Sequence, residues 1–144
     1  MQNKNSGLNY IINKTIHKVY YSAQIHNLLR KDILQIKNKP KVLFIYDKNI
    51  SYKIIKKISS SLKNNGNQIV SLPVIGGKEN KDANLLFKII DILNKNEFTK
   101  NSIIVAMGGG VVGDVASFAA AIYMRGIYYF HIPSTMTAIV DSCI

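Results

Sequence analysis

Residues 102–126, SIIVAMGGGVVGDVASFAAAIYMRG, decide the fold class, because an apolar run, a glycine triplet and a run of small residues follow one another. The run Ser102–Met107 contains no charge and predicts a strand that is buried on both faces. The segment Asp114–Met124 has the length and the small residues of a closely packed helix. Residues 108–113 are therefore predicted to form a glycine-rich loop between a strand and a helix.

Apolar runs of strand length and amphipathic segments of helix length alternate through the rest of the chain. The patterns predict further strands at Lys41–Tyr46, Gln68–Val74 and Ile127–Ile132, and a strand or hairpin at Tyr10–Tyr21. Helices are predicted at Ser22–Ile36, Ile50–Asn64 and Asp82–Asn94, the last of them capped by Asp82. This alternation predicts an α/β domain with a Rossmann-like, mostly parallel sheet and helices on both faces.

The composition indicates one globular domain over residues 1–144, with 47% hydrophobic and 19% charged residues. It excludes a disordered chain, a collagen-like repeat and a coiled coil. The longest apolar run without a charge or glycine, Val115–Met124, has ten residues and is too short to cross a bilayer. The N-terminus lacks the apolar segment of a signal peptide, and the single cysteine, Cys143, excludes an internal disulfide. We therefore expect a cytoplasmic protein that does not act on membranes.

The net charge of +11 raises the question of nucleic-acid binding. Seventeen of the nineteen basic residues are lysines, and they are scattered over residues 4–100. The chain has no arginine cluster and no alternation of basic and aromatic residues. We expect solvated lysines and no nucleic-acid partner, while weak, salt-sensitive binding to polyanions stays open as an alternative.

Polar residues follow the first two predicted strands of the sheet, where ligands of parallel sheets bind. Asp47 and Asn49 follow the first strand, and a carboxylate at this position accepts hydrogen bonds from ribose hydroxyls. A helix cap is the alternative role for this acid. Gly76–Gly77 follow the next strand, and Lys78 and Lys81 are placed to meet phosphate or ribose. An ordinary surface loop is the alternative there.

The glycines after the strand at 102–107 match the pattern G-x-G-x-x-G at Gly108, Gly110 and Gly113. Glycines let a pyrophosphate approach the backbone, and the N-terminus of the following helix favours an anion. The loop follows a late strand, and no acid stands about twenty residues further on, unlike the usual dinucleotide fingerprint. Asp114 follows at once; because a carboxylate repels phosphate, we expect it to reach a hydroxyl or a cation. A helix-capping aspartate is the alternative.

Hydroxyl groups follow the last predicted strand, at Ser134, Thr135 and Thr137. They are candidates for ligand contacts, with helix capping as the alternative. Asp141 lies in an apolar, helix-like run, where a carboxylate needs a partner. The three histidines are far apart in the sequence and predict no metal site.

Two spaced motifs, GGGVVGDVASFAAAIYMRG at 108–126 and PSTMTAIVDS at 133–142, resemble those of 3-dehydroquinate synthases and related sugar phosphate cyclases. DKN at 47–49 and GGKENK at 76–81 are similar to the family's earlier cofactor motifs, so the resemblance runs from about residue 8 to the end. It implies an N-terminal NAD-binding domain followed by a helical metal domain. It also implies a lyase of the shikimate pathway, which makes aromatic amino acids. In that reaction NAD oxidises an alcohol of a seven-carbon sugar phosphate, phosphate is eliminated, the ketone is reduced again and the ring closes.

The resemblance also implies roles for individual residues. It implies NAD contacts at Asp47, Asn49, Lys81, Gly109, Gly110, Val111, Asp114, Ser134 and Thr135. Asp141 is implied as a substrate contact. Arg125 resembles an arginine that reaches the substrate phosphate from the partner subunit, which implies a homodimer. The zinc or cobalt of the family is bound by a later domain, so no metal ligand and no catalytic residue is assigned within this chain.

The chain departs from the family pattern in two ways. Lys78 stands where a glutamate is usual, and Ser134 replaces a commoner threonine. The sequence ends at Ile144 within the second motif, so we expect an N-terminal part that lacks the metal domain and does not catalyse cyclisation alone. A 2-deoxy-scyllo-inosose or valiolone-type cyclase, an iron-dependent alcohol dehydrogenase and a non-catalytic nucleotide-binding remnant stay open as alternatives.

Overall fold

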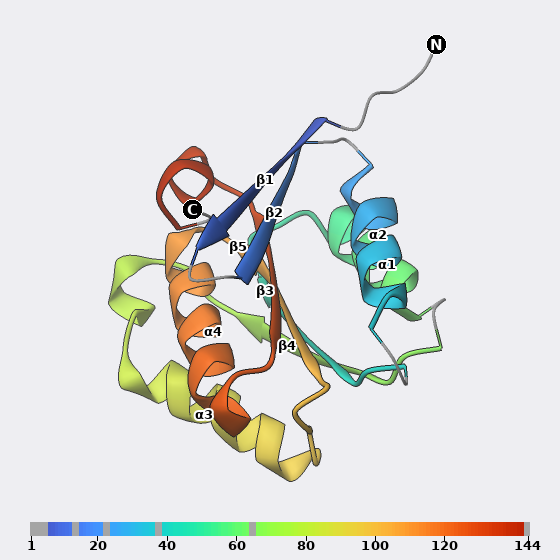
Figure 1. Cartoon of the computed structure of the whole chain (residues 1–144). Coiled ribbons are helices and arrows are strands. Elements are labelled where there is room, and N and C mark those ends of the chain that lie inside the picture. The colour runs from blue at the N-terminus through green and yellow to red at the C-terminus, as the bar shows by residue number, and fades with distance from the viewer. Residues whose placement is uncertain (1–5, 13–14, 22–23, 37–38, 64–65, 143–144) are drawn as a thin grey trace.

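A parallel four-stranded sheet organises the computed structural model, which describes residues 6–12, 15–21, 24–36, 39–63 and 66–142 (Figure 1). The strands are β1 (Ser6–Ile12), β2 (Thr15–Tyr21), β3 (Val42–Asp47), β4 (Ile69–Val74), β5 (Ile103–Gly108) and β6 (Tyr128–Pro133). The helices are α1 (Ile25–Leu34), α2 (Tyr52–Lys63), α3 (Ala83–Lys95) and α4 (Gly110–Ile122). Short helical turns span Lys78–Asn80, Tyr123–Arg125 and Ala138–Ser142. Cys143 lies outside the described residues.

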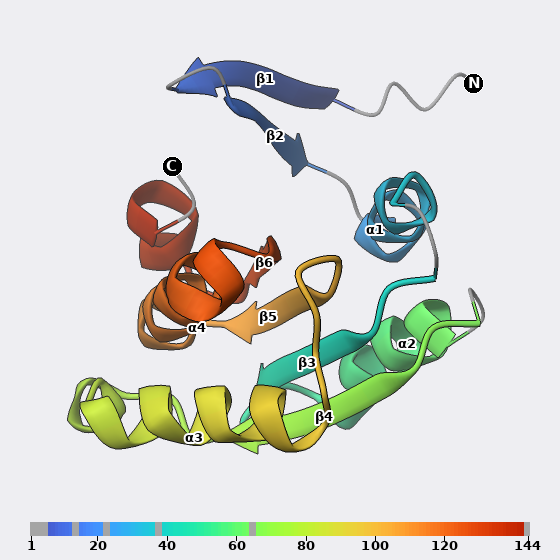
Figure 2. The ribbon, with the colours of Figure 1, turned by 60° about the horizontal axis from the view of Figure 1, so that its bottom comes forward.

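The strand order in the sheet is β4-β3-β5-β6, and every neighbouring pair is parallel. Alternate residues of β3 face opposite ways: Leu43 and Ile45 pack with α3 and α4, whereas Val42 and Phe44 pack with α1 and α2. Helices therefore cover both faces of the sheet (Figure 2). This arrangement confirms the α/β fold with a Rossmann-like parallel sheet that the sequence predicts.

Most of the predicted elements are present within a few residues of their expected limits. β1 and β2 pair antiparallel as a separate two-stranded sheet, which confirms the expected hairpin. Asp82 caps α3, because its Oδ1 atom accepts a hydrogen bond from the N–H group of Leu85 at 3.0 Å. Among the described residues, no helix is both long enough and apolar enough to span a membrane.

The predicted loop at residues 108–113 is wrong. Gly108 ends β5, Gly109 is the N-cap of α4, and the helix already begins at Gly110. Glycine is unfavourable in the interior of a helix, so the local sequence favoured a loop. The packing of α4 outweighs that preference: a Cβ atom at Gly113 would overlap the ring of His131 in β6, with Nε2 only 2.7 Å away.

The contact between α4 and β6 is therefore close enough to exclude any side chain at Gly113. The hydroxyl of Tyr129 donates a hydrogen bond to the carbonyl oxygen of Gly113 at 3.0 Å, and Gly113 is buried. Small buried residues, Ala116, Ala119 and Ala120, continue the same helix. They let α4 lie low on the sheet, which sets where its N-terminus stands.

Replacing Gly113 by alanine is expected to lower the free energy of unfolding by about 1–3 kcal/mol, because the new methyl group overpacks the contact with His131. Urea denaturation followed by circular dichroism measures the change. Ser60→Ala, at an exposed position of α2, is the control and should stay within about 0.5 kcal/mol of the parent. Equal stability of Gly113→Ala and the parent would contradict the close packing.

Candidate functional site

The order of the strands creates a topological switch point at one edge of the sheet. From β3 the chain first continues to β4 on one side, and later returns to β5 on the other side of β3. The connections that leave the carboxyl ends of β3 and β5 therefore diverge, and ligands of open α/β sheets bind at such a switch point. Asp47 ends β3 and Gly108 ends β5, so both residues lie at this switch point.

Asp47 holds its carboxylate at the end of β3 by a local turn. Its Oδ1 atom accepts a hydrogen bond from the N–H group of Asn49 at 2.9 Å. The N–H group of Lys48 donates to the carbonyl oxygen of Val74 at 2.9 Å, which ties the ends of β3 and β4 together. The alternative role of Asp47 as a helix cap is wrong, because α2 begins only at Tyr52.

The N-terminus of α4 stands at the end of β5. The first helical hydrogen bond of its backbone joins the N–H group of Gly113 to the carbonyl oxygen of Gly109 at 3.1 Å. Helix geometry leaves the amides of Gly110, Val111 and Val112 without a partner inside the helix. These amides and the helix dipole make the helix start favourable for an anion such as a phosphate group.

The segment after β6 covers the start of α4. The N–H group of Ser134 donates to the carbonyl oxygen of Gly108 at 2.9 Å. A Cβ atom at Gly109 would lie 3.3 Å from the Cγ2 atom of Thr135, so Thr135 stands directly over the N-cap. The Oγ1 atom of Thr135 accepts a hydrogen bond from the N–H group of Ala138 at 3.2 Å, as the capping alternative expected for one of these hydroxyls. Ser134, Thr135 and Gly109 thus lie together.

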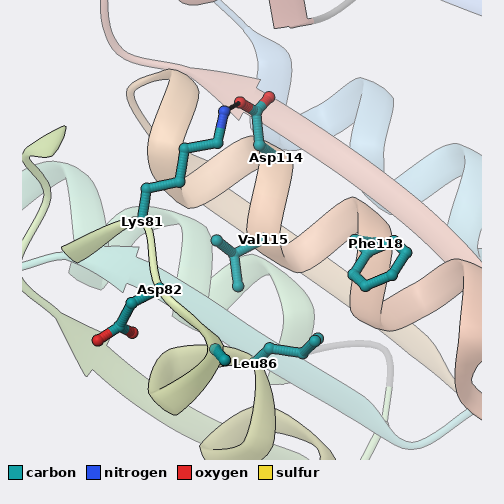
Figure 3. A pocket seen from close by; sticks show the side chains of 7 residues that line it. Lys81, Asp82, Leu86, Asp114, Val115 and Phe118 are labelled. Carbon is teal, nitrogen blue, oxygen red and sulfur yellow. Dashed lines mark hydrogen bonds and ion pairs between the residues drawn. The ribbon is translucent and has the colours of Figure 1, made fainter. Parts of the chain in front are cut away.

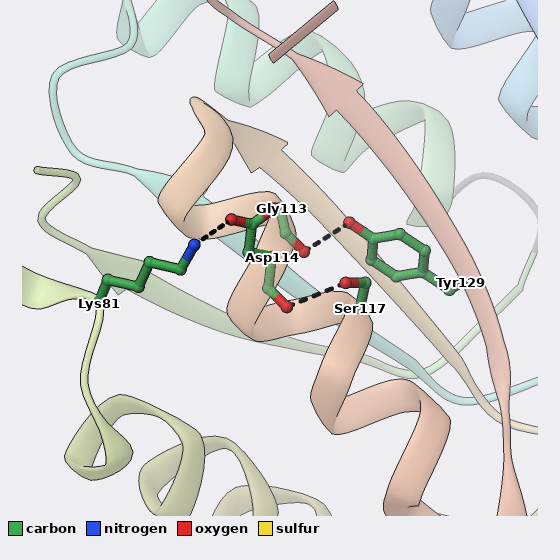
Figure 4. A network of polar contacts seen from close by, with 5 residues as sticks. All are labelled: Lys81, Gly113, Asp114, Ser117 and Tyr129. Atoms are coloured by element: carbon green, nitrogen blue, oxygen red, sulfur yellow. Dashed lines mark hydrogen bonds and ion pairs between the residues drawn. The ribbon is translucent and has the colours of Figure 1, made fainter. Parts of the chain in front are cut away.

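Lys81 and Asp114 form an ion pair beside this helix start (Figure 4). The Nζ atom of Lys81 lies 2.6 Å from the Oδ2 atom of Asp114, and the two side chains are 55% and 38% exposed. Within the chain, Asp114 contacts a cationic side chain, one of the two kinds of partner, hydroxyl or cation, that the sequence predicted; its alternative as a helix cap is wrong, because Gly109 occupies that position. The hydrogen bond with Asp114, and secondarily the charge of Asp114, raises the pKa of Lys81; the charge of Asp141 adds to this effect.

A groove runs outward from the ion pair between α3 and α4 (Figure 3). Its lining combines Lys81 and Asp114 with the side chains of Leu86, Val115 and Phe118. Hydrogen bonds from the N–H group of Leu85 and the side chain of Asn84 lower the pKa of Asp82, which also borders the groove.

Arg125 stands apart from the other residues that the sequence singled out. α4 leads from the carboxyl end of β5 to the beginning of β6, so Tyr123–Arg125 lies at the opposite edge of the sheet from Asp47 and Gly109. The backbone of Met124 and Arg125 is left-handed, with φ angles of 49° and 64°, and Arg125 is exposed. Within one chain, Arg125 and the switch-point residues therefore cannot contact the same small ligand.

Asp141 lies in the helical turn Ala138–Ser142 and is exposed to solvent, although its apolar surroundings in the sequence suggested a carboxylate that needs a partner. Its charge acts on Lys81, which places it on the same side of the sheet as the ion pair. In the part of the chain that the structure describes, no three histidine, cysteine or acidic residues gather as metal ligands would.

One functional feature escaped the sequence analysis, namely the contact between Gly76 and Asp47. A Cβ atom at Gly76 would overlap the Oδ2 atom of Asp47 and lie 3.2 Å from its Cγ atom. This contact can be recognised only when β3 and β4 are known to pair in parallel, with Asp47 opposite Val74. The sequence shows both residues but not that the two strand ends are neighbours.

Residues 71–144 match the family model described as 3-dehydroquinate synthase N-terminal. The chain belongs to this family. The 3-dehydroquinate synthase of Prochlorococcus marinus strain MIT 9215 is 38% identical over 130 residues, which are 89% of this chain and 36% of that protein. The chain thus spans about a third of the length of the curated relatives it matches.

Solved structures share the fold of this family member. A 2-deoxy-scyllo-inosose synthase, complexed with carbaglucose-6-phosphate, NAD⁺ and Co²⁺, matches 95% of the chain with a TM-score of 0.84 and 21% identity, over 37% of its own length. An NADH-dependent butanol dehydrogenase from Thermotoga maritima matches 78% of the chain with a TM-score of 0.64 and 20% identity, over 31% of its length. These likenesses show the fold, which cyclases and a dehydrogenase have in common.

Replacing Asp114 by asparagine is expected to lower the pKa of Lys81 toward its ordinary value, because the substitution removes the charge that holds the ammonium group. The raised pKa also means that the ion pair stabilises the fold below the ordinary lysine pKa, and that this contribution disappears as the pH rises through the raised value. NMR titration of the lysine side-chain resonances measures the pKa of Lys81 directly.

Asp91→Asn is the matched control for this titration. Asp91 accepts a hydrogen bond from Lys95 at 2.8 Å within α3, and this pair raises the pKa of Lys95. The control should lower the pKa of Lys95 and leave that of Lys81 unchanged. An unaltered Lys81 pKa in Asp114→Asn would show that the ion pair does not form.

Proposed function

We propose that residues 1–144 form the NAD-binding N-terminal domain of a 3-dehydroquinate synthase, a carbon–oxygen lyase that cyclises a seven-carbon sugar phosphate. The observation that carries this proposal is the meeting of Asp47 and the N-terminus of α4 at the switch point of the sheet. Membership in the family supports the same function. Because the chain spans about a third of its relatives, the complete reaction is proposed for the whole protein.

The residues at the switch point fit a dinucleotide. The carboxylate of Asp47 can accept hydrogen bonds from ribose hydroxyls, and the amides at the start of α4 can bind the pyrophosphate. Thr135 stands over Gly109 at this helix start, and Lys81 neutralises Asp114 beside it. The proposed NAD contacts are Asp47, Asn49, Lys81, Gly109, Gly110, Val111, Asp114, Ser134 and Thr135. When bound, NAD would accept a hydride from a substrate alcohol and later return it.

The remaining parts of the site are proposed to come from elsewhere. The exposed position of Arg125 at the opposite edge supports a homodimer in which this arginine binds the substrate phosphate in the partner's site. Asp141, near the ion pair, is proposed to contact the substrate. We propose that the family's divalent metal is bound in the part of the relatives that this chain does not span. We also propose a cytoplasmic location.

A related sugar phosphate cyclase is the second candidate function. The TM-score of 0.84 to a 2-deoxy-scyllo-inosose synthase supports it. The 38% identity to a 3-dehydroquinate synthase, against 21% to the cyclase structure, favours the first candidate. The valiolone-type cyclase and the nucleotide-binding remnant share the proposed NAD site.

NAD binding by the chain, measured by isothermal titration calorimetry, tests the proposal. We expect the parent chain to bind NAD, and Gly109→Ala to bind it about tenfold or more weakly, because the new methyl group would press on Thr135, 3.3 Å away, and shift the segment that covers the helix start. The φ of −76° at Gly109 suits alanine, so the fold should persist. Ser60→Ala, at an exposed position of α2, is the control with unchanged affinity. A parent chain that does not bind NAD would refute the proposal.

The isolated chain is expected not to release phosphate from a seven-carbon sugar phosphate in the presence of NAD and zinc. The physical reason is that the chain spans about a third of its relatives, and that its described residues contain no cluster of metal ligands. A phosphate-release assay measures this, with an intact 3-dehydroquinate synthase as the positive control. Turnover by the chain alone would mean that residues 1–144 contain the complete catalytic site.

A further inference from the structure

Gly76 is a glycine whose backbone does not require one. Positive φ angles occur at Gly66, Gly77 and Gly126 among the described glycines, but not at Gly76. The reason for glycine at this position is space: a Cβ atom would overlap the Oδ2 atom of Asp47 and stand 3.2 Å from its Cγ atom. The absence of a side chain at Gly76 therefore makes room for one specific carboxylate.

The carboxylate of Asp47 is held from two sides. Asn49 donates its N–H group to Oδ1 at 2.9 Å, while Gly76 lies against Oδ2. The parallel pairing of β3 with β4 and the hydrogen bond from Lys48 to Val74 keep the two strand ends in this register. Asp47 is only partly exposed, so the hydrogen bond from Asn49 and the space at Gly76 together favour this one position of its carboxylate at the edge of the sheet.

This carboxylate distinguishes two kinds of nucleotide. A free 2′-hydroxyl of the adenosine ribose donates a hydrogen bond to a carboxylate, whereas a 2′-phosphate offers no such donor and repels its charge. We infer that Gly76 is a specificity-determining residue, because it lets Asp47 occupy the position from which that acid selects NAD over NADP. This inference rests on the proposed function, in which the switch point binds a dinucleotide.

The basic residues near Asp47 also affect which nucleotide is bound. Lys48 follows it directly and Lys78 begins the next turn of the β4 loop, and both lysines are exposed. These lysines would attract a 2′-phosphate if the acid were absent. The selectivity is therefore expected to depend on this single carboxylate, and on the glycine that gives it room.

The test is the ratio of the dissociation constants for NADP and NAD, measured by calorimetry on the full chain. We expect the parent to bind NAD about 10- to 100-fold more tightly than NADP, the worth of one charged hydrogen bond. Asp47→Ser should bring the ratio close to one. Gly76→Ala should move the ratio in the same direction, because the new methyl group displaces the flexible end of Asp47 rather than backbone.

Two further variants separate this role from a merely structural one. In the Asp47→Ser background, Gly76→Ala should have no additional effect on the ratio, since the carboxylate it displaces is gone. Asp91→Ser removes the same charge from the exposed face of α3 and should leave the ratio unchanged. Circular dichroism of each variant confirms that the fold is retained.

The possible results separate nucleotide selection by Asp47 and Gly76 from NAD binding itself. If the parent binds NAD and NADP equally, or if Gly76→Ala keeps the parent's ratio, the inference is overturned while NAD binding stands. If a folded Asp47→Ser variant keeps the ratio, the carboxylate is not the selecting group, and the inference is again overturned. If the parent binds neither nucleotide, the proposed function fails and the inference fails with it.

Discussion

The close approach of α4 to β6 at Gly113 is the contact on which the position of the candidate site depends. No side chain fits between Gly113 and the ring of His131, and Tyr129 hydrogen-bonds to the same residue. The helix therefore lies low on the sheet, and its N-terminus stands at the carboxyl end of β5. A bulkier residue at this point would lift the helix and move the amides that are proposed to bind phosphate.

Charge at the edge of the sheet is arranged in two opposite ways. Asp114 is neutralised by Lys81 beside the helix start, so the amides there can accept an anion. At the end of β3, the carboxylate of Asp47 is held by the N–H group of Asn49 and by the space at Gly76. The start of α4 thus suits phosphate and the end of β3 suits hydroxyl groups, as a dinucleotide requires.

The sequence predicted what depends on local periodicity and failed where tertiary packing decides. The helices and strands, and the cap at Asp82, follow from spacing and side-chain chemistry. The helical state of residues 110–113 could not be predicted, because the low helix propensity of glycine is outweighed by a contact with a strand that comes later in the chain. The partner of Asp114 was expected to be a hydroxyl or a cation, but the sequence could not name Lys81, which is 33 residues away and comes near only in the fold.

The central claim is that a dinucleotide binds between the ends of β3 and β5. Amide NMR of the isotope-labelled chain during titration with NAD tests it most directly, because each backbone amide reports on its own surroundings. We expect chemical-shift changes that saturate with NAD at Gly109, Gly110 and Val111 together with Asp47 and Asn49. The amide signals along the lysine-rich helix α2 should not change. Shifts confined to α2 would instead indicate non-specific binding of an anion, and would contradict the account.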